Sequence, residues 1–233
     1  NWSFTMPAYC ARVSYSCQKV LNAQVMWRDF DFVEYGTGKY KFASNNISII
    51  RGTDSDWNFD FNKDTKTLII KNVSTTLEGE KYTIDGKDTL CYLYVNASSD
   101  STFTNFTLKT IGEFKINAPA DRIYPIMAIY VTGAHLTIEN DSGNTAKYNF
   151  ILPNSYNWDN YGIYCTNHIS IINHDYSSNN NEIRINLGYS KNYSIGIHGE
   201  GDVSIEKSNV SIQFTTTFNS GNISNNGIIR YRI

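Results

Sequence analysis

Aromatic side chains recur in this chain at a spacing that could bring them together. Tyr130, Tyr164 and His198 are separated by 34 residues each and occupy the same place in a short repeated pattern, and Tyr94 stands in a similar context. If the repeats stack, the four rings form one outward column, because neighbouring strands lie about 4.8 Å apart. An exposed column of rings beside polar groups could bind the apolar faces of sugar rings. The alternatives are that the rings stabilise adjacent strands or lie under a loop.

A second column combines residue types that bind metals and transfer protons. His135, His168 and Asp202 each come just before an inward-facing residue of a predicted strand. Imidazole and carboxylate groups in line could hold a divalent metal or act as acid and base. The simpler interpretation is that they are solvated residues beside turns. The acids of the loop 198–202 could hold calcium only if several oxygen ligands converged there.

The motifs of several enzyme classes are missing from the sequence. It has no GxSxG nucleophile elbow, no HExxH zinc motif and no GxxxxGK[ST] phosphate loop. Acidic residues cluster at Asp54, Asp56 and Asp60, and again at Asp85 and Asp88, in contexts typical of turns. Glycoside hydrolysis needs a pair of facing carboxylates, which these clusters do not predict. The sequence therefore assigns no catalytic residue and no cofactor, and it favours a non-enzymatic protein while leaving enzyme activity open.

The elements that must position these residues are repeated short strands. Residues 128–131, 162–165 and 196–199 share one pattern, and an apolar-polar-apolar trio follows each of them, at 136–138, 169–171 and 203–205. A fixed period of this size is typical of solenoids, and alternating strands make the solenoid a β one. The predicted fold class is all-β, a parallel β-helix or β-solenoid with an N-terminal capping segment. Parallel connections of this kind are generally right-handed.

The repeats also divide the chain. Residues 1–50 do not repeat but contain apolar residues such as Phe4, Trp27 and Phe30. Since the end of a solenoid exposes core and unpaired strand edges, we interpret residues 1–50 as a cap. Residues 51–233 form the predicted solenoid, with irregular coils of roughly 31–36 residues. The pattern starts again at Gly227, which predicts that the solenoid continues, or docks onto a partner, beyond the C-terminus.

Composition excludes some partners. The net charge is −2 and only 18% of the residues are charged, so the chain has no basic surface for nucleic acid. No run of about 18 apolar residues is present to span a membrane. The first residues lack the basic and apolar regions of a signal peptide, which indicates that a signal was removed or that the chain was cut from a larger one.

Cysteines and asparagines suggest an oxidising compartment. Cys10 and Cys17 are close enough in sequence to form a disulfide there, whereas Cys165 is expected to be a buried free thiol. Nine Asn-x-Ser/Thr triplets are candidate glycosylation sites, although an Asn-rich chain also produces such triplets by chance. Their asparagines are Asn1, Asn46, Asn72, Asn96, Asn105, Asn140, Asn192, Asn209 and Asn222. The predicted location is secreted or at the cell surface.

Part of the chain resembles a known family. The run Trp57-Asn58-Phe59-Asp60, the segment 66–72 (KTLIIKN) and the Gly-Ile and Ile-Ser-Ile units that follow resemble the β-solenoid surface proteins of low-GC gut bacteria. The likeness covers about residues 57–233. It implies a right-handed parallel β-helix that binds carbohydrate or acts as an adhesin. Pectate-lyase-type enzymes share this architecture, and a shared fold alone carries no activity.

Three functions are compatible with these features. The first is a non-enzymatic surface protein that binds a glycan or another cell-surface partner through Tyr94, Tyr130, Tyr164 and His198. The second is a structural subunit that self-associates into a filament or surface layer through open β ends. The third is a polysaccharide lyase or hydrolase built on the same β-helix.

Overall fold

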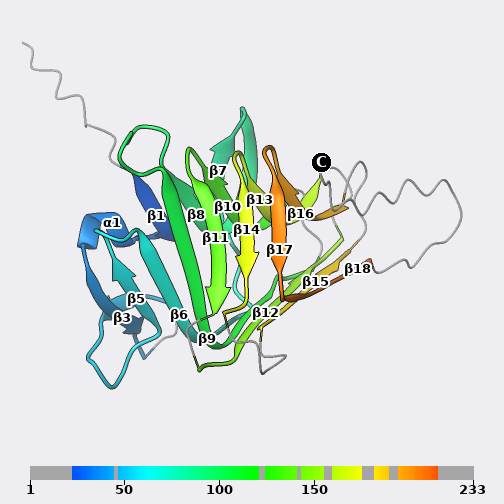
Figure 1. Ribbon diagram of the computed structural model, residues 1–233. Helices are drawn as coiled ribbons and strands as arrows, with labels where there is room; N and C mark the ends of the chain where they lie inside the picture. The colour runs from blue at the N-terminus through cyan, green and yellow to red at the C-terminus, as the bar shows by residue number, and fades with distance from the viewer. Residues whose placement is uncertain are drawn as a thin grey trace, which may run out of the picture.

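The described part of the chain is almost entirely β-structure. The computed structural model describes residues 23–44, 47–120, 124–140, 143–154, 159–174, 181–188 and 194–214. In these ranges the chain forms eighteen strands and one short helix, α1 (Phe32–Tyr35) (Figure 1). The predicted all-β class is confirmed. No helix among these residues is long and apolar enough to cross a membrane.

The N-terminal elements pair in antiparallel fashion. They are β1 (Gln24–Trp27), β2 (Phe30–Asp31), α1, β3 (Gly38–Phe42), β4 (Ile49–Arg51) and β5 (Phe59–Asn62). Strand β1 pairs with the edge of β8 (Lys87–Asn96), and β5 pairs with β6 (Thr67–Thr75). These strands therefore occupy edges that would otherwise present unpaired N–H and C=O groups. Antiparallel pairing continues past residue 50 to Asn62, and residues 1–22 lie outside the described chain.

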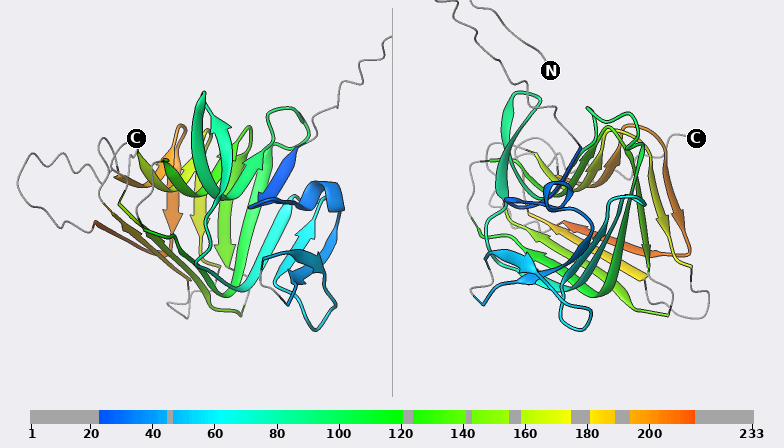
Figure 2. Two further views of the ribbon diagram at one scale, coloured as in Figure 1. Left: turned by 180° about the vertical axis from the view of Figure 1, so that it is seen from behind. Right: turned by 90° about the vertical axis from the view of Figure 1, so that its left-hand side faces the viewer.

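The remaining strands build three parallel ladders, which the chain visits in the same order each time (Figures 1 and 2). The first ladder contains β8, β10 (Ile126–Thr132), β13 (Asn160–Cys165) and β16 (Ser194–Gly199). The second contains the first half of β9 (Asn105–Asn117), then β11 (His135–Asn140), β14 (Ile169–Ile172) and β17 (Val203–Glu206). The third contains the second half of β9, then β12 (Ala146–Leu152), β15 (Asn181–Leu187) and β18 (Asn209–Phe214). Each visit to the three ladders therefore lies directly against the previous one.

The register of these ladders matches the period of the sequence. Ile129 pairs with Ile163, which pairs in turn with Ile197. In the second ladder Leu136, Ile169 and Val203 align in the same way. The predicted alignment of residues 34 apart is confirmed for both sets. A one-residue slip would turn every one of these apolar side chains to the opposite face, so burial fixes the register.

The enclosed core changes character along the molecule. Near the N-terminal strands it is aromatic: the ring of Trp27 lies 5.6 Å from Phe59 and 5.4 Å from Phe114. Further along, the inward residues of the ladders are aliphatic, such as Ile171 and Ile185, both fully buried. Cys165 is a buried free thiol, as predicted. Burial raises the pKa of this thiol to about 11, so it stays protonated and behaves as a small apolar group.

Two glycines make room for this aliphatic packing. A Cβ atom on Gly162 would lie 2.7 Å from Cγ2 of Ile185 and 2.5 Å from the carbonyl oxygen of Gly196. On Gly196 a Cβ atom would lie 2.4 Å from Cδ1 of Ile212. The glycines of the repeated Gly-Ile unit therefore let the third ladder approach the first.

We predict that Gly162→Ala destabilises the protein. A methyl group here meets both a side chain and backbone, and overpacking of this kind costs about 1–3 kcal/mol of unfolding free energy. Urea denaturation followed by circular dichroism measures it. Lys147→Ala, on the exposed face of β12, is the control and should change the free energy by less than about 0.5 kcal/mol. Equal stability of Gly162→Ala and wild type would contradict the packing described.

Candidate functional site

The outer face of the first ladder carries the predicted aromatic column. Pairing aligns Tyr94 with Tyr130, Tyr130 with Tyr164 and Tyr164 with His198. The ring centroids of successive pairs are 5.6, 5.5 and 4.7 Å apart, with interplanar angles of 16°, 29° and 28°. The structure therefore brings all four predicted residues into one continuous stack.

Half of this stack is covered, which corrects the expectation of an exposed platform. Strand β7 (Glu80–Ile84) forms an antiparallel hairpin with β8, and the rear view in Figure 2 shows it in front of the first ladder. Tyr82 stacks on Tyr94 at 4.1 Å, and its hydroxyl donates to the carbonyl of Arg28. Tyr94 and Tyr130 are only 9% and 5% exposed. The alternative of a covering segment thus holds for these two rings, while Tyr164 and His198 remain half-buried.

The hairpin had a recognisable signal in the sequence. Its turn is Asp85-Gly86, and both residues have positive φ, 49° and 76°. A two-residue turn of this composition between strand-like runs is a strong hairpin signature. The sequence analysis treated Asp85 only as part of an acidic cluster in a turn.

A further aromatic residue completes the exposed end of the stack. Tyr161 lies in a neighbouring outward column, where pairing aligns it with Met127. Its ring is almost perpendicular to that of Tyr164, at 5.0 Å and 85°, and lies 6.2 Å from His198. Sequence reasoning missed Tyr161, although it precedes the repeated Gly-Ile unit as Met127 precedes Ala128-Ile129.

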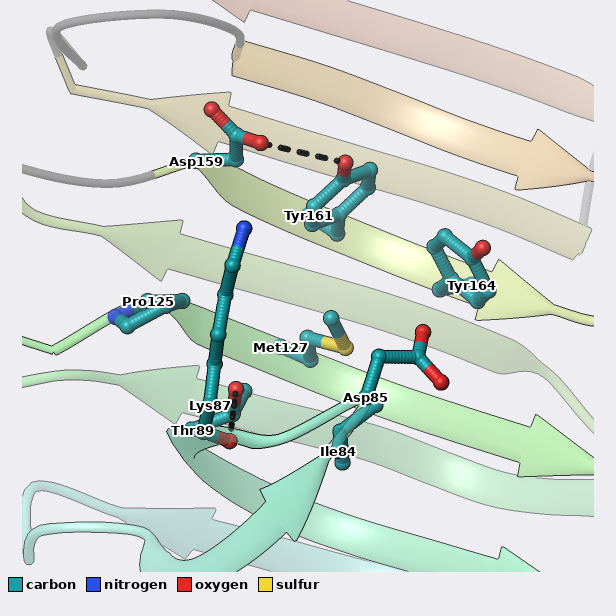
Figure 3. Close-up of a pocket in the computed structure, with 9 residues that line it drawn as sticks. All are labelled: Ile84, Asp85, Lys87, Thr89, Pro125, Met127, Asp159, Tyr161 and Tyr164. Atoms are coloured by element: carbon teal, nitrogen blue, oxygen red, sulfur yellow. Dashed lines mark hydrogen bonds between the residues drawn. The ribbon is translucent and has the colours of Figure 1, made fainter.

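A small pocket lies between these rings and the hairpin (Figure 3). It has a volume of about 110 Å³, and its floor is apolar, with Met127, Ile84 and Pro125. Charged side chains surround it: Lys87 runs across the pocket toward Asp159, and Asp85 lies on the side of Tyr164. The hydroxyl of Tyr161 donates to Oδ2 of Asp159 at 3.5 Å. The site thus combines ring faces with groups that can exchange hydrogen bonds with hydroxyls.

Glu200 fixes the exposed tyrosine. The Tyr164 hydroxyl donates to Oε1 of Glu200 at 2.6 Å. Burial and then the neighbouring carboxylate raise the pKa of Tyr164 well above its usual value, and burial raises that of Tyr130 to about 12. Both phenols are therefore neutral at physiological pH, and Tyr164 presents a fixed ring rather than a nucleophile.

The second predicted column is also assembled, but its nitrogen atoms are engaged elsewhere. The rings of His135 and His168 lie 4.8 Å apart. Nδ1 of His168 accepts a hydrogen bond from the backbone N–H of Asp202 at 2.8 Å, and Oδ2 of Asp202 lies 3.6 Å from the same nitrogen. Within the described ranges no group of three or more His, Cys, Asp or Glu side chains is arranged to hold a metal ion. The column therefore acts as a hydrogen-bonded stack in this structure.

The candidate glycosylation sites differ in accessibility. Asn72, Asn105 and Asn209 are exposed, and Asn96 is half-buried. Asn140 is 1% exposed, and its Oδ1 accepts the N–H of His174 at 2.9 Å. A glycan on Asn140 is incompatible with this folded arrangement. Asn1, Asn46, Asn192 and Asn222, and the predicted disulfide partners Cys10 and Cys17, lie outside the described residues.

Comparison with known proteins gives no relative to guide the interpretation. No protein-family model matches the chain, and no curated protein or solved structure is significantly similar to it.

We predict that Tyr82→Ala loosens the hairpin and exposes the covered rings. The variant loses the stack on Tyr94 and the hydrogen bond to Arg28, which should lower the free energy of unfolding by about 2–3 kcal/mol. Second-derivative absorbance should report more solvent-exposed tyrosine. Lys81→Ala removes the neighbouring, largely exposed side chain and should change neither quantity. Unchanged tyrosine exposure in Tyr82→Ala would contradict the covering role of the hairpin.

Proposed function

We propose that the chain is a β-solenoid with an antiparallel N-terminal cap, of the kind that its resemblance to bacterial surface proteins implies. The support is the fixed order in which the chain visits three parallel ladders, with partners 34 residues apart. The right-handed sense follows from the general preference of parallel connections. Such an architecture offers long, regular faces for binding.

On this architecture we propose a non-enzymatic glycan-binding function, centred on Tyr161, Tyr164 and His198. The observation that carries it is the pair of perpendicular tyrosine rings beside a pocket rimmed by Asp85, Lys87 and Asp159. A sugar ring has apolar C–H faces and equatorial hydroxyls. The rings would take the former, and the charged side chains would hydrogen-bond the latter.

The size of the pocket bears on the mode of binding. Enclosed ligand sites usually measure roughly 300–1,000 Å³, so a pocket of about 110 Å³ has room for a substituent and not for a whole sugar. The sugar would therefore lie across Tyr161 and Tyr164 with one group in the pocket. Open binding of this kind suits adhesion through many weak contacts.

Location and assembly remain proposals of the same account. Exposed Asn72, Asn105 and Asn209 in glycosylation triplets and a surface poor in charge support a secreted or cell-surface protein. Self-association into a filament is the alternative. A lyase or hydrolase is the other alternative, and the same ligand tests it.

We predict that Tyr161→Ala and Tyr164→Ala each weaken binding to a glycan selected on an array by about tenfold or more. Tyr164→Phe keeps the ring and loses only the hydroxyl, so its binding should stay within about threefold of wild type. Isothermal titration calorimetry measures the affinities.

Tyr35→Ala is the matched control, since Tyr35 is 56% exposed on a different part of the chain. Equal losses in Tyr35→Ala and Tyr164→Ala, or unchanged binding in the site variants, would contradict the proposal. Release of new reducing ends from the bound glycan would instead favour the enzyme.

A further inference from the structure

A second cavity lies far from the aromatic column in the sequence of strands, between the turn after β1 and the bulge of β6. Its volume is about 340 Å³. Polar side chains line much of it, with Trp27, Phe42 and Leu77 as apolar walls. The polar residues are Arg28, Asn58, Asn72, Ser74 and Thr75. None of the residues that line it is acidic.

The backbone around this cavity is unusual. Arg28 and Asn72 are two of the five non-glycine residues in the described chain with positive φ, at 53° and 49°. Asparagine tolerates this conformation, but arginine adopts it at a cost of about 1 kcal/mol or more. Such conformations persist where the surrounding structure holds them, and they gather at binding sites.

Asn72 is held over the cavity by a β-bulge. The register between β6 and β9 shifts between Lys71 and Val73, and bulges commonly redirect a side chain. The Asn72 carboxamide then lies over Gly112, whose φ is 74° and where a Cβ atom would be 1.9 Å from Oδ1 of Asn72. The position of this amide therefore depends on a glycine in the neighbouring strand.

Arg28 is fixed along its length while its charge has no acidic partner. Its N–H donates to the Tyr92 carbonyl at 2.9 Å and its Nε donates to the Glu78 carbonyl at 3.0 Å. No ion pair joins Arg28 to a carboxylate within the described residues. A guanidinium that is held in this way is preorganised to bind a carboxylate through two parallel hydrogen bonds.

Two further side chains define what else the cavity could recognise. The Asn58 amide is already engaged, since it accepts from the N–H of Phe42 and donates to the carbonyl of Lys71. The Ser74 hydroxyl makes no hydrogen bond to the part of the chain that the structure describes, and the residue is exposed. Ser74 and Asn72 are thus the groups placed to bind ligand hydroxyls.

We propose that this cavity binds an acidic monosaccharide unit, with its carboxylate on Arg28 and its hydroxyls on Asn72 and Ser74. Its volume of about 340 Å³ is in the range of small-ligand sites, roughly 300–1,000 Å³. This site shares no lining residue with the pocket at Tyr161 and Tyr164, so either can fail without the other.

The test is calorimetric titration of the full chain with sodium glucuronate and with glucose. Protein from bacterial expression keeps Asn72 free of glycan. Glucuronate should bind at least tenfold more tightly than glucose, and addition of it should shift the indole N–H signal of Trp27 in a ¹H–¹⁵N spectrum. Equal affinities, or no binding of glucuronate at millimolar concentration, would overturn the proposal.

Variants assign the contacts. Arg28→Gln should weaken glucuronate binding about tenfold or more, Ser74→Ala by about threefold, and the control Arg184→Gln, an exposed arginine on β15, by less than twofold. Unchanged binding in a folded Arg28→Gln overturns the assignment. If Arg28→Gln does not fold, Ser74→Ala and the Trp27 signal decide: loss of affinity with a shifted signal supports the site, and absence of both overturns it.

Discussion

The in-register parallel pairing of strands 34 residues apart is the constraint on which the rest of the structure depends. It places Ile129, Ile163 and Ile197 in one buried column. Since side chains alternate between the two faces of a strand, the same register also places Tyr130, Tyr164 and His198 together on the outside. One repeated spacing therefore generates both the core and the candidate binding face. The glycines at 162 and 196 keep the third ladder close enough to close that core.

The aromatic column serves two purposes along its length. Near the N-terminal strands the β7–β8 hairpin covers it, and Tyr82, Tyr94 and Met127 form a small hydrophobic cluster outside the main core. Further along, the rings emerge beside charged groups of the hairpin turn. The proposed glycan site thus lies where structural packing ends and solvent access begins. The proposed acidic-sugar cavity arises differently, from a bulge and two left-handed residues.

The periodic features could be predicted from the sequence, whereas the exceptions to the period could not. The aligned columns and the all-β class followed from alternation and spacing, because burial leaves little choice of register. The exposure of Tyr94 and Tyr130 was predicted wrongly, since it depends on a hairpin with no counterpart in the other repeats. The cavity at Asn72 depends on positive φ angles and a bulge, which residue types hardly encode. Asn140 matches a glycosylation triplet, yet its hydrogen bond inside a turn buries it.

The register is tested most directly by cross-linking. Ser170 and Ser204 are paired in adjacent strands, and their hydroxyl oxygens lie 2.9 Å apart, so cysteines at both positions fit disulfide geometry. Mild oxidation of the Ser170→Cys, Ser204→Cys variant should link the two introduced cysteines, as peptide mapping would show. Ser170→Cys with Glu206→Cys, two residues out of register, should remain reduced. A link in the second variant and none in the first would contradict the parallel register and the account built on it.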